Sequence, residues 1–238
     1  MANEPEPAPL SRDICTCFDQ HEVSNRRRVR FHAERQDTSS PAWQHLLTLI
    51  DEAAADGREV FRPLAELSPQ DRREIVTLPP TIAKLTAVKH LNLYGSNLVR
   101  LPPEIGAMTS LEEFTPYTSY RLHWYPYELT RCPNLRRSTV STRALYGNEK
   151  LRPPFPALPA AEQDLTELRT CSVCDRSLES AEVHQAWISL RVAADVLPLL
   201  VNACSPACLQ ALPTPPEDYV PTPHTGGPGL AQPPADYA

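Results

Sequence analysis

The chain has 238 residues, of which 41% are hydrophobic and 7% aromatic, and its formal net charge is −6. This composition allows one or two domains with a core of ordinary size, and the acidic balance argues against a chain devoted to nucleic acid. Residues 1–12 lack the apolar region of a secretory signal, and no apolar run approaches the ~18 residues of a membrane span.

The chain contains seven cysteines, an odd number without an export signal. This count favours a reducing compartment, with metal-bound or buried thiols, over a disulfide framework. We therefore expect a cytoplasmic protein that does not enter the membrane. The sequence does not indicate an oligomeric state.

Two features of the N-terminal region each allow two interpretations. We expect residues 1–12 to form a disordered tail. Cys15, Cys17, His21 and His32 could form a metal site, or the histidines could be ordinary surface residues. The basic run Arg26–Arg30 could contact phosphate, or could be a solvated segment.

The spacing of apolar residues predicts a helix over 42–55. Ser40 suits the N-cap, Pro41 suits the first helical position, and Gly57 ends the pattern. A second, short helix is expected after Ser68, where a proline and an acid follow the capping serine. These helices would cap the first turn of a repeat array.

A hydrophobic pattern begins at Val88 and recurs at Leu111 and Leu135, at intervals of 23 and 24 residues. Eight positions match between its first two copies, which pair as follows: Val88 with Leu111, Leu91 with Phe114, Leu93 with Pro116, Leu98 with Leu122, Leu101 with Tyr125, Pro102 with Pro126, Ile105 with Leu129, and Met108 with Cys132. This period is typical of leucine-rich repeats.

The stretch LNLYGSNLVRLPPEIGAMTSLEEF, residues 91–114, resembles bacterial leucine-rich-repeat proteins. The resemblance implies a curved solenoid that recognises other proteins. The predicted fold class is therefore α/β: a short leucine-rich-repeat solenoid with N-terminal cap helices over 13–152, followed by a small zinc-stapled β-hairpin and helix unit.

The candidate binding face consists of alternate strand residues and of an aromatic-rich stretch in the second repeat. Tyr125 and Trp124 are expected in the core. The other aromatic residues of this stretch could contact a partner, or could fill an irregular repeat. The candidates for partner contact are His90, Asn92, Tyr94, Tyr117, Tyr120, Arg121, His123 and Arg137.

The C-terminal third begins with a proline-rich linker over 153–165. A second unit is expected over 166–212. The tail over 213–238 is rich in proline and glycine and is expected to be extended or disordered, or to lie along the domains as a strap.

Four cysteines of the second unit form two close pairs, Cys171 with Cys174 and Cys204 with Cys208, separated by 29 residues. Two such pairs can supply four thiolates to one zinc ion. The apolar runs 187–192 and 197–201 predict a hairpin between the pairs, and Ser205 begins a helix that carries Cys208. Four cysteines leave no open position for water, which favours structural zinc; reduced structural thiols and a redox C-x-x-C remain alternatives.

This order of motifs looks like a treble-clef zinc finger, and the closing ACSPACLQAL, residues 203–212, is similar to the end of small fingers of that kind.

No phosphate-binding glycine loop, G-x-S-x-G motif or zinc-protease helix occurs. Our leading hypothesis is a non-catalytic module that binds a protein partner. The first alternative is nucleic-acid binding through the finger and Arg26–Arg30. The second is an enzyme or effector component with a site near His123.

Overall fold

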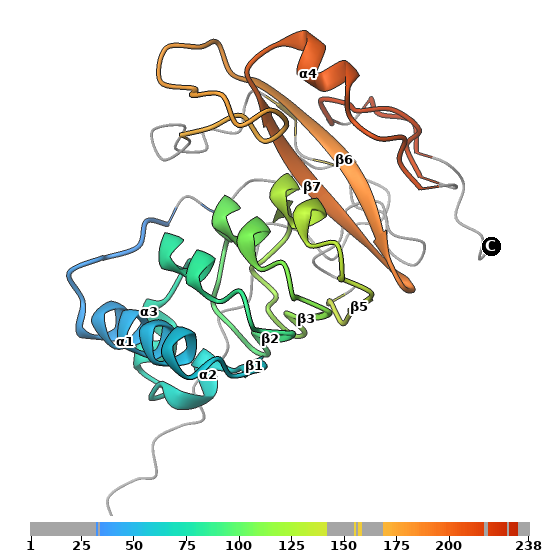
Figure 1. Cartoon of the computed structure of the whole chain (residues 1–238). Coiled ribbons are helices and arrows are strands. Elements are labelled where there is room, and N and C mark those ends of the chain that lie inside the picture. Colours follow the sequence, from blue (N-terminus) through green and yellow to red (C-terminus); the bar gives the residue numbers. More distant parts are fainter. Residues whose placement is uncertain are drawn as a thin grey trace, which may run out of the picture.

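The computed structural model describes residues 32, 34–141, 155, 157–158, 169–216, 219–227 and 229–232. It has an α/β architecture with two sheets (Figure 1). Its elements are α1 (Pro41–Asp56), β1 (Val60–Phe61), α2 (Pro63–Glu66), α3 (Asp71–Glu74), η1 (Pro80–Lys84), β2 (His90–Asn92), η2 (Pro103–Ala107), β3 (Glu113–Thr115), β4 (Tyr125–Pro126), η3 (Tyr127–Arg131), β5 (Arg137–Ser138), β6 (His184–Val192), β7 (Asp195–Ala203) and α4 (Pro206–Gln210), where η marks a 3₁₀ helix.

Helix α1 confirms the first predicted helix and its capping residues. The Ser40 side chain accepts a hydrogen bond from the backbone N–H of Trp43, and Pro41 occupies the first turn. Gly57 ends the helix in the left-handed conformation, with φ of 67°, which glycine adopts without steric cost. The short helix α3 begins where expected, because the Ser68 hydroxyl accepts a hydrogen bond from the N–H of Asp71.

Sheet A is a parallel sheet with the strand order β1-β2-β3-β5. Its register places His90 opposite Glu113, and Glu113 opposite Arg137. These partners are separated by the 23- and 24-residue intervals of the sequence pattern. Each strand has only two or three residues, so the apolar side chains between the strands and the 3₁₀ helices supply most of the packing.

The three 3₁₀ helices lie side by side, η1 against η2 and η2 against η3, on the side of the core opposite sheet A (Figure 1). Gly106 in η2 lies against the backbone of Glu128 in η3. A Cβ atom at position 106 would lie 2.6 Å from the carbonyl oxygen of Glu128. The missing side chain therefore allows the two helices to approach this closely.

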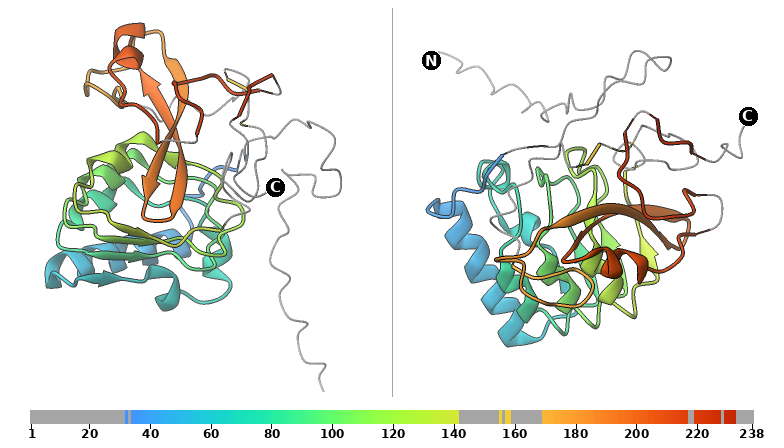
Figure 2. Two further views of the ribbon diagram at one scale, coloured as in Figure 1. Left: turned by 90° about the vertical axis from the view of Figure 1, so that its right-hand side faces the viewer. Right: turned by 90° about the horizontal axis from the view of Figure 1, so that it is seen from above.

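Sheet B has the strand order β4-β7-β6. Strands β6 and β7 form an antiparallel hairpin of nine residue pairs, and β4 pairs with β7 in parallel, with Tyr125 opposite Leu199. The hairpin lies at the β5 end of sheet A, whereas α1 lies at the opposite end (Figure 2). Both predicted strands of the hairpin are confirmed, and both are longer than expected.

The predicted fold class is wrong, because no solenoid is seen among the described residues. The structure is α/β, with the parallel sheet A joined to the mixed sheet B. The reason lies in the aromatic stretch of the second repeat: Tyr125 and Pro126 form β4 and pair with β7 of the C-terminal hairpin. One continuous core then includes residues of both regions, such as Phe114 and Ile188.

A second, smaller core lies on the other face of the hairpin. It contains Trp124, Phe155, Leu158, Trp187 and Leu200. The expected linker over 153–165 and the expected tail over 213–238 are described only in part. Within the latter, the described residues Pro215, Tyr219, Val220 and Gly227 are buried.

Candidate metal centre and exposed sheet face

The four cysteines that the sequence pairs come together in space. The side-chain sulfurs of Cys171, Cys174, Cys204 and Cys208 all lie within 4.8 Å of one another. Three of the distances between sulfurs are 3.5 Å, 3.7 Å and 3.7 Å. Cys171 and Cys208 are buried, while Cys174 is exposed. Together these side chains can bind one metal ion.

The first pair is held in a tight turn, which we call the cysteine loop, residues 171–176. The N–H of Asp175 donates to the carbonyl of Cys171, and Asp175 takes the left-handed conformation with φ of 61°, which aspartate tolerates better than most residues. The Cys171 sulfur accepts hydrogen bonds from the N–H groups of Val173 and Cys204, both at 3.4 Å. Such donors stabilise a thiolate, the form that binds metal.

The second pair joins the end of β7 to the start of α4. Ser205 caps the helix, because its hydroxyl accepts a hydrogen bond from the N–H of Cys208, and Pro206 occupies the first turn. Cys204 precedes this cap and Cys208 lies in the helix. The local signals of the sequence therefore place both sulfurs on the side that faces the cysteine loop.

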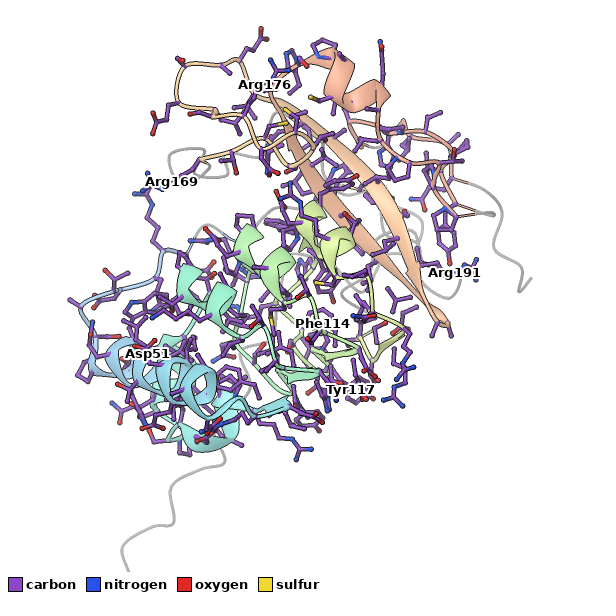
Figure 3. All side chains as sticks on the ribbon, viewed as in Figure 1. Asp51, Phe114, Tyr117, Arg169, Arg176 and Arg191 are labelled. Atoms are coloured by element: carbon purple, nitrogen blue, oxygen red, sulfur yellow. The ribbon has the colours of Figure 1, made fainter. Side chains whose placement is uncertain are left out.

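Arg176 is a charged neighbour of the cluster that the sequence analysis did not single out. Its guanidinium donates to the Cys174 sulfur at 3.5 Å, and this hydrogen bond lowers the pKa of Cys174 to about 6. Figure 3 shows Arg176 close to the sulfur atoms, next to α4. A nearby cation favours thiolate formation, which suits a metal ligand.

Polar contacts from η3 hold the cysteine loop against the rest of the molecule. Arg131 donates to the carbonyl of Ser172 at 2.7 Å and pairs with Asp175 at 2.6 Å. Glu128 is buried beside them, and burial raises the pKa of its carboxyl above the usual value. No motif marks these residues in the sequence, because their partners lie about 40 positions away.

The tip of the hairpin has a second polar attachment, at β5. The Asp195 carboxylate accepts hydrogen bonds from the Ser138 hydroxyl at 2.8 Å and from the Val140 N–H at 3.3 Å. Burial raises the pKa of Asp195. The hairpin is thus fixed at both ends and, through β4, in the middle.

The exposed face of sheet A gathers several of the candidate contact residues. His90 lies between Thr115, at 2.9 Å from its hydroxyl, and Glu113, at 3.6 Å from its carboxylate; Arg137 pairs with the same carboxylate at 3.1 Å. Burial lowers the pKa of His90. The Asn92 side chain accepts a hydrogen bond from the N–H of Tyr94. Thr115, His90, Glu113 and Arg137 thus form a connected polar row.

Tyr94 and Tyr117 stand out on this face. They are 53% and 44% exposed, and their ring centroids are 5.9 Å apart. Val60 is the third large hydrophobic residue exposed in the described part of the chain. Tyr117 lies at the sheet end of the molecule, away from the hairpin (Figure 3).

Of the other candidates from the aromatic stretch, Tyr120 is half-buried, and Arg121 and His123 are engaged inside the protein. His123 is 2% exposed and donates to the carbonyl of Tyr120 at 2.9 Å, and its ring packs against the ring of His32 at a tilt of 54°. Arg121 is largely buried and forms an ion pair with Glu34. These contacts attach the segment before α1 to the loop after β3.

Some sequence predictions lie outside the described residues. These are the basic run Arg26–Arg30 and the possible ligands Cys15, Cys17 and His21. Within the described residues, the cysteine quartet is the group of three or more potential ligands that lies close enough to share a metal ion. Nor does any helix in this part of the chain have the length and apolar character needed to cross a bilayer.

Comparison with protein-family models and with curated proteins finds no match for the chain.

Proposed function

We propose that the protein is a non-catalytic protein-binding module. In this proposal a structural zinc ion holds the C-terminal unit together, and the exposed face of sheet A binds a protein partner through Tyr94 and Tyr117. The observation that carries the binding proposal is the exposed tyrosine pair on a face that also carries polar side chains and the exposed Val60.

The sulfur geometry supports zinc as the metal. Four sulfurs at the usual zinc distance of about 2.3 Å from a central ion lie about 3.8 Å from one another in a tetrahedron. The distances of 3.5 Å to 3.7 Å between three pairs are close to this value. Four thiolates also complete the coordination shell, which is typical of structural rather than catalytic zinc.

The order of the elements supports a treble-clef finger. The cysteine loop comes first, the β6–β7 hairpin follows, and α4 carries the last ligand, Cys208. The zinc would then join the two ends of the hairpin unit. In this proposal the surrounding side chains position the cysteine ligands and do not take part in catalysis.

Metal analysis tests this part of the proposal. Untagged protein purified without chelator should contain one zinc per chain, and the double variant Cys171→Ser, Cys208→Ser should contain none. The matched control is Cys132→Ser, a buried cysteine outside the quartet, which should keep the zinc. Wild-type protein without metal, or a double variant that retains it, would refute the zinc site.

The tyrosine pair supports the protein-binding part. Tyrosine combines a large apolar area with a hydrogen-bonding end and is enriched at the energetic centres of interfaces. Next to the pair, His90, Glu113 and Arg137 provide donors and acceptors of both charges. An apolar centre beside polar groups is the usual anatomy of a protein interface.

Affinity capture tests the binding face. We would immobilise the wild type, the variant Tyr94→Ala, Tyr117→Ala and the control Tyr94→Phe, Tyr117→Phe, and quantify captured proteins from an extract of expressing cells. A specific partner should be lost at least about tenfold with the alanine variant, and the phenylalanine control should retain most of it. Equal capture by the wild type and the alanine variant would exclude this face.

A further inference from the structure

Residues 219–227, which we call the strap, contact the outer edge of strand β6. Strand β6 is an edge strand of sheet B, and the strap pairs with it at one position. Trp187 donates its N–H to the carbonyl of His224 at 2.8 Å and accepts from the N–H of His224 at 3.2 Å. In the described part of the chain, the backbone hydrogen bonds between the strap and β6 are limited to this residue pair. The strap is thus attached to the sheet without forming a strand of it.

The strap also contacts the segment around Phe155. Leu158 donates its N–H to the carbonyl of Thr225 at 2.8 Å, and Gly227 donates its N–H to the carbonyl of Phe155 at 2.9 Å. Phe155 and Leu158 are buried and belong to the small core around Trp187. The strap therefore links this segment to the edge of the hairpin.

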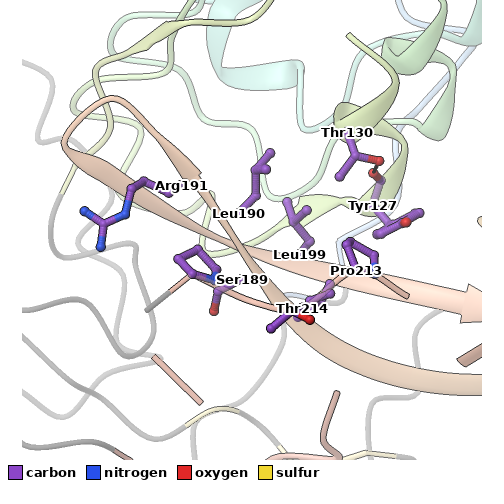
Figure 4. A pocket seen from close by; sticks show the side chains of 10 residues that line it. Tyr127, Thr130, Ser189, Leu190, Arg191, Leu199, Pro213 and Thr214 are labelled. Carbon is purple, nitrogen blue, oxygen red and sulfur yellow. Dashed lines mark hydrogen bonds between the residues drawn. The ribbon is translucent and has the colours of Figure 1, made fainter. Parts of the chain in front are cut away.

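The start of the strap is held by side chains. Tyr219 is buried, and the guanidinium of Arg191 lies 5.8 Å from the centroid of its ring. Figure 4 shows this guanidinium directed away from Leu190, which lines a cavity of about 380 Å³ beside β6 and η3. The segment that precedes the strap lines the same cavity, with Pro213, Thr214 and Pro216. Because this segment borders empty space, the attachment of the region to the hairpin depends mainly on the strap itself.

His224 is the central residue of these contacts. Its ring packs edge-on against Phe155, with ring centroids 4.5 Å apart. Its Nδ1 accepts a hydrogen bond from the N–H of Gly226 at 3.1 Å, so the ring proton of the neutral form lies on Nε2. Nε2 is buried and has no hydrogen-bond partner among the described residues. The site thus fits a neutral imidazole and leaves its N–H group unpaired.

A second proton does not fit this site. It would have to bind Nδ1, where it would point at the N–H of Gly226, and two donors would then face each other. The charged and titratable side chains on the described elements around His224 are His184 and Arg191 of β6 and Tyr219 of the strap, and none of them is a carboxylate that could compensate a positive charge. Burial alone lowers the pKa of His224, to about 4.

The attached and detached strap therefore differ in proton affinity. In the detached strap the ring is exposed to water, and its pKa returns toward the ordinary value of 6.5. The attached state binds fewer protons, so attachment is strongest above pH 6.5 and weakens as the pH falls from 6.5 toward 4. Between pH 7.5 and pH 5.5 the ratio of detached to attached strap should rise about tenfold.

We propose that the strap is an acid-released cover: at neutral pH it covers the edge of β6 and the small core, and protonation of His224 detaches it. One ionisable group can control the strap, because its backbone hydrogen bonds to β6 and to the segment around Phe155 all lie within three residues of His224. Detachment would expose Trp187 and Phe155, which are 0% and 2% exposed while the strap is attached. This device depends on neither the zinc nor the tyrosine pair, and it adds regulation by pH to the proposed function.

Hydrogen exchange in the full chain tests the local release. Protection factors, which correct for the pH dependence of intrinsic exchange, would be measured by NMR at pH 7.5 and pH 5.5. The amides of Trp187 and Leu158 both donate to the strap, and each should lose protection about tenfold at pH 5.5. The amide of Ile188, which lies in the β6–β7 ladder, should keep its protection. Unchanged protection of Trp187, or an equal loss at Ile188, would overturn the proposal.

Substitution of His224 tests whether this residue causes the pH dependence. His224→Asn places a side-chain oxygen near the position of Nδ1, so it can accept from Gly226 but cannot ionise. In this variant the loss of Trp187 protection between pH 7.5 and pH 5.5 should disappear. The matched control is His184→Asn on β6, which should keep the wild-type pH dependence. A pH dependence that persists in His224→Asn would assign the effect to another group and refute the role of His224.

Direct titration of the wild type keeps the test decisive if His224→Asn does not hold the strap. In protein labelled with ¹³C-histidine, the ring signals of His224, identified by their absence from the variant, should remain those of a neutral imidazole at pH 5.5. A titration midpoint near the ordinary value of 6.5 would show that the attached strap does not exclude the proton, and would overturn the proposal.

Discussion

The two sheets of this protein are stabilised in different ways. Sheet A has strands of two or three residues, and its stability depends on buried side chains such as Leu91 and Phe114. Sheet B has a nine-pair hairpin with extensive backbone pairing, but its far end is closed by the cysteine quartet. The comparison teaches that short strands depend on a deep core, whereas a long hairpin at the surface places its potential metal ligands at its open end.

Within the described residues, several specific contacts join the two regions. Strand β4 pairs with β7, Arg131 reaches the cysteine loop, and Asp195 reaches β5. The core is continuous across this junction. Substitutions in each region and at the junction therefore show how far the two regions depend on each other.

The largest effect is expected from removal of the metal ligands. The double variant Cys171→Ser, Cys208→Ser should lose at least about 5 kcal/mol of unfolding free energy relative to the zinc-bound protein, because metal binding is coupled to folding of such units. Chemical denaturation followed by circular dichroism measures this loss. Adding a strong zinc chelator to the wild type should reproduce it, and should change the double variant little.

A core substitution in sheet A tests the other region. Phe114 is fully buried and packs edge-on against Tyr125, with ring centroids 5.5 Å apart. Phe114→Ala should lower the free energy of unfolding by about 3 to 5 kcal/mol, because it leaves a cavity. The zinc content should remain one per chain, and loss of zinc would show that the quartet cannot form without an intact sheet A. The control Phe114→Leu removes less side-chain volume and should cause a smaller loss of unfolding free energy.

The junction contact at Arg131 should have a smaller effect. Arg131→Met removes the hydrogen bond to the Ser172 carbonyl and should cost about 1 to 2 kcal/mol, most of it from that bond, since the ion pair with Asp175 is partly exposed. Arg136 pairs with Glu112 at the surface, and Arg136→Met should cost less than about 0.5 kcal/mol. Urea denaturation of both variants makes the comparison; equal losses would show that the junction contact does not stabilise the fold.

Substitution of the buried Glu128 should change the free energy of unfolding least, and this change should depend on pH. Burial raises the pKa of its carboxyl in the folded state, so the protonated form stabilises the fold at low pH and this contribution is lost as the pH rises through that pKa. Glu128→Gln removes the charge and should increase the free energy of unfolding by about 1 kcal/mol at pH 8. At pH 4, below the ordinary pKa of a glutamate, the carboxyl is protonated in both states and the gain should largely disappear.

Denaturation of wild type and variant at both pH values measures the difference. Glu104→Gln is the matched control, because Glu104 holds the equivalent second position of η2. A gain for Glu128→Gln that is as large at pH 4 as at pH 8, or larger, would contradict the sign of the effect.

Local signals in the sequence predict local structure well. Ser40, Pro41 and Gly57 give the bounds of α1, and Ser205 gives the start of α4. Each cysteine spacing predicts its own pair, because a single turn brings its two sulfurs together. The β6–β7 hairpin, which the apolar runs also predict, then brings the two pairs together.

The sequence does not predict contacts between distant segments. Tyr125 was assigned to the core, where it lies, but its pairing with Leu199 has no periodic signal. That pairing replaces the solenoid expected from the repeat pattern. Similarly, Arg121 and His123 were expected at a binding face, but Glu34 and His32 engage them from a segment more than 80 residues away.

The close approach at Gly106 makes the spacing between η2 and η3 depend on a single hydrogen atom. Any larger group there would meet a main-chain oxygen, which cannot rotate aside as a side chain can. Separation of the two helices would displace Glu128 and Arg131, and with them the attachment of the cysteine loop. One small residue in η2 thus influences the position of the cysteine loop, which contacts η3 on its other side. Anyone who grafts this architecture into another protein should keep glycine at position 106.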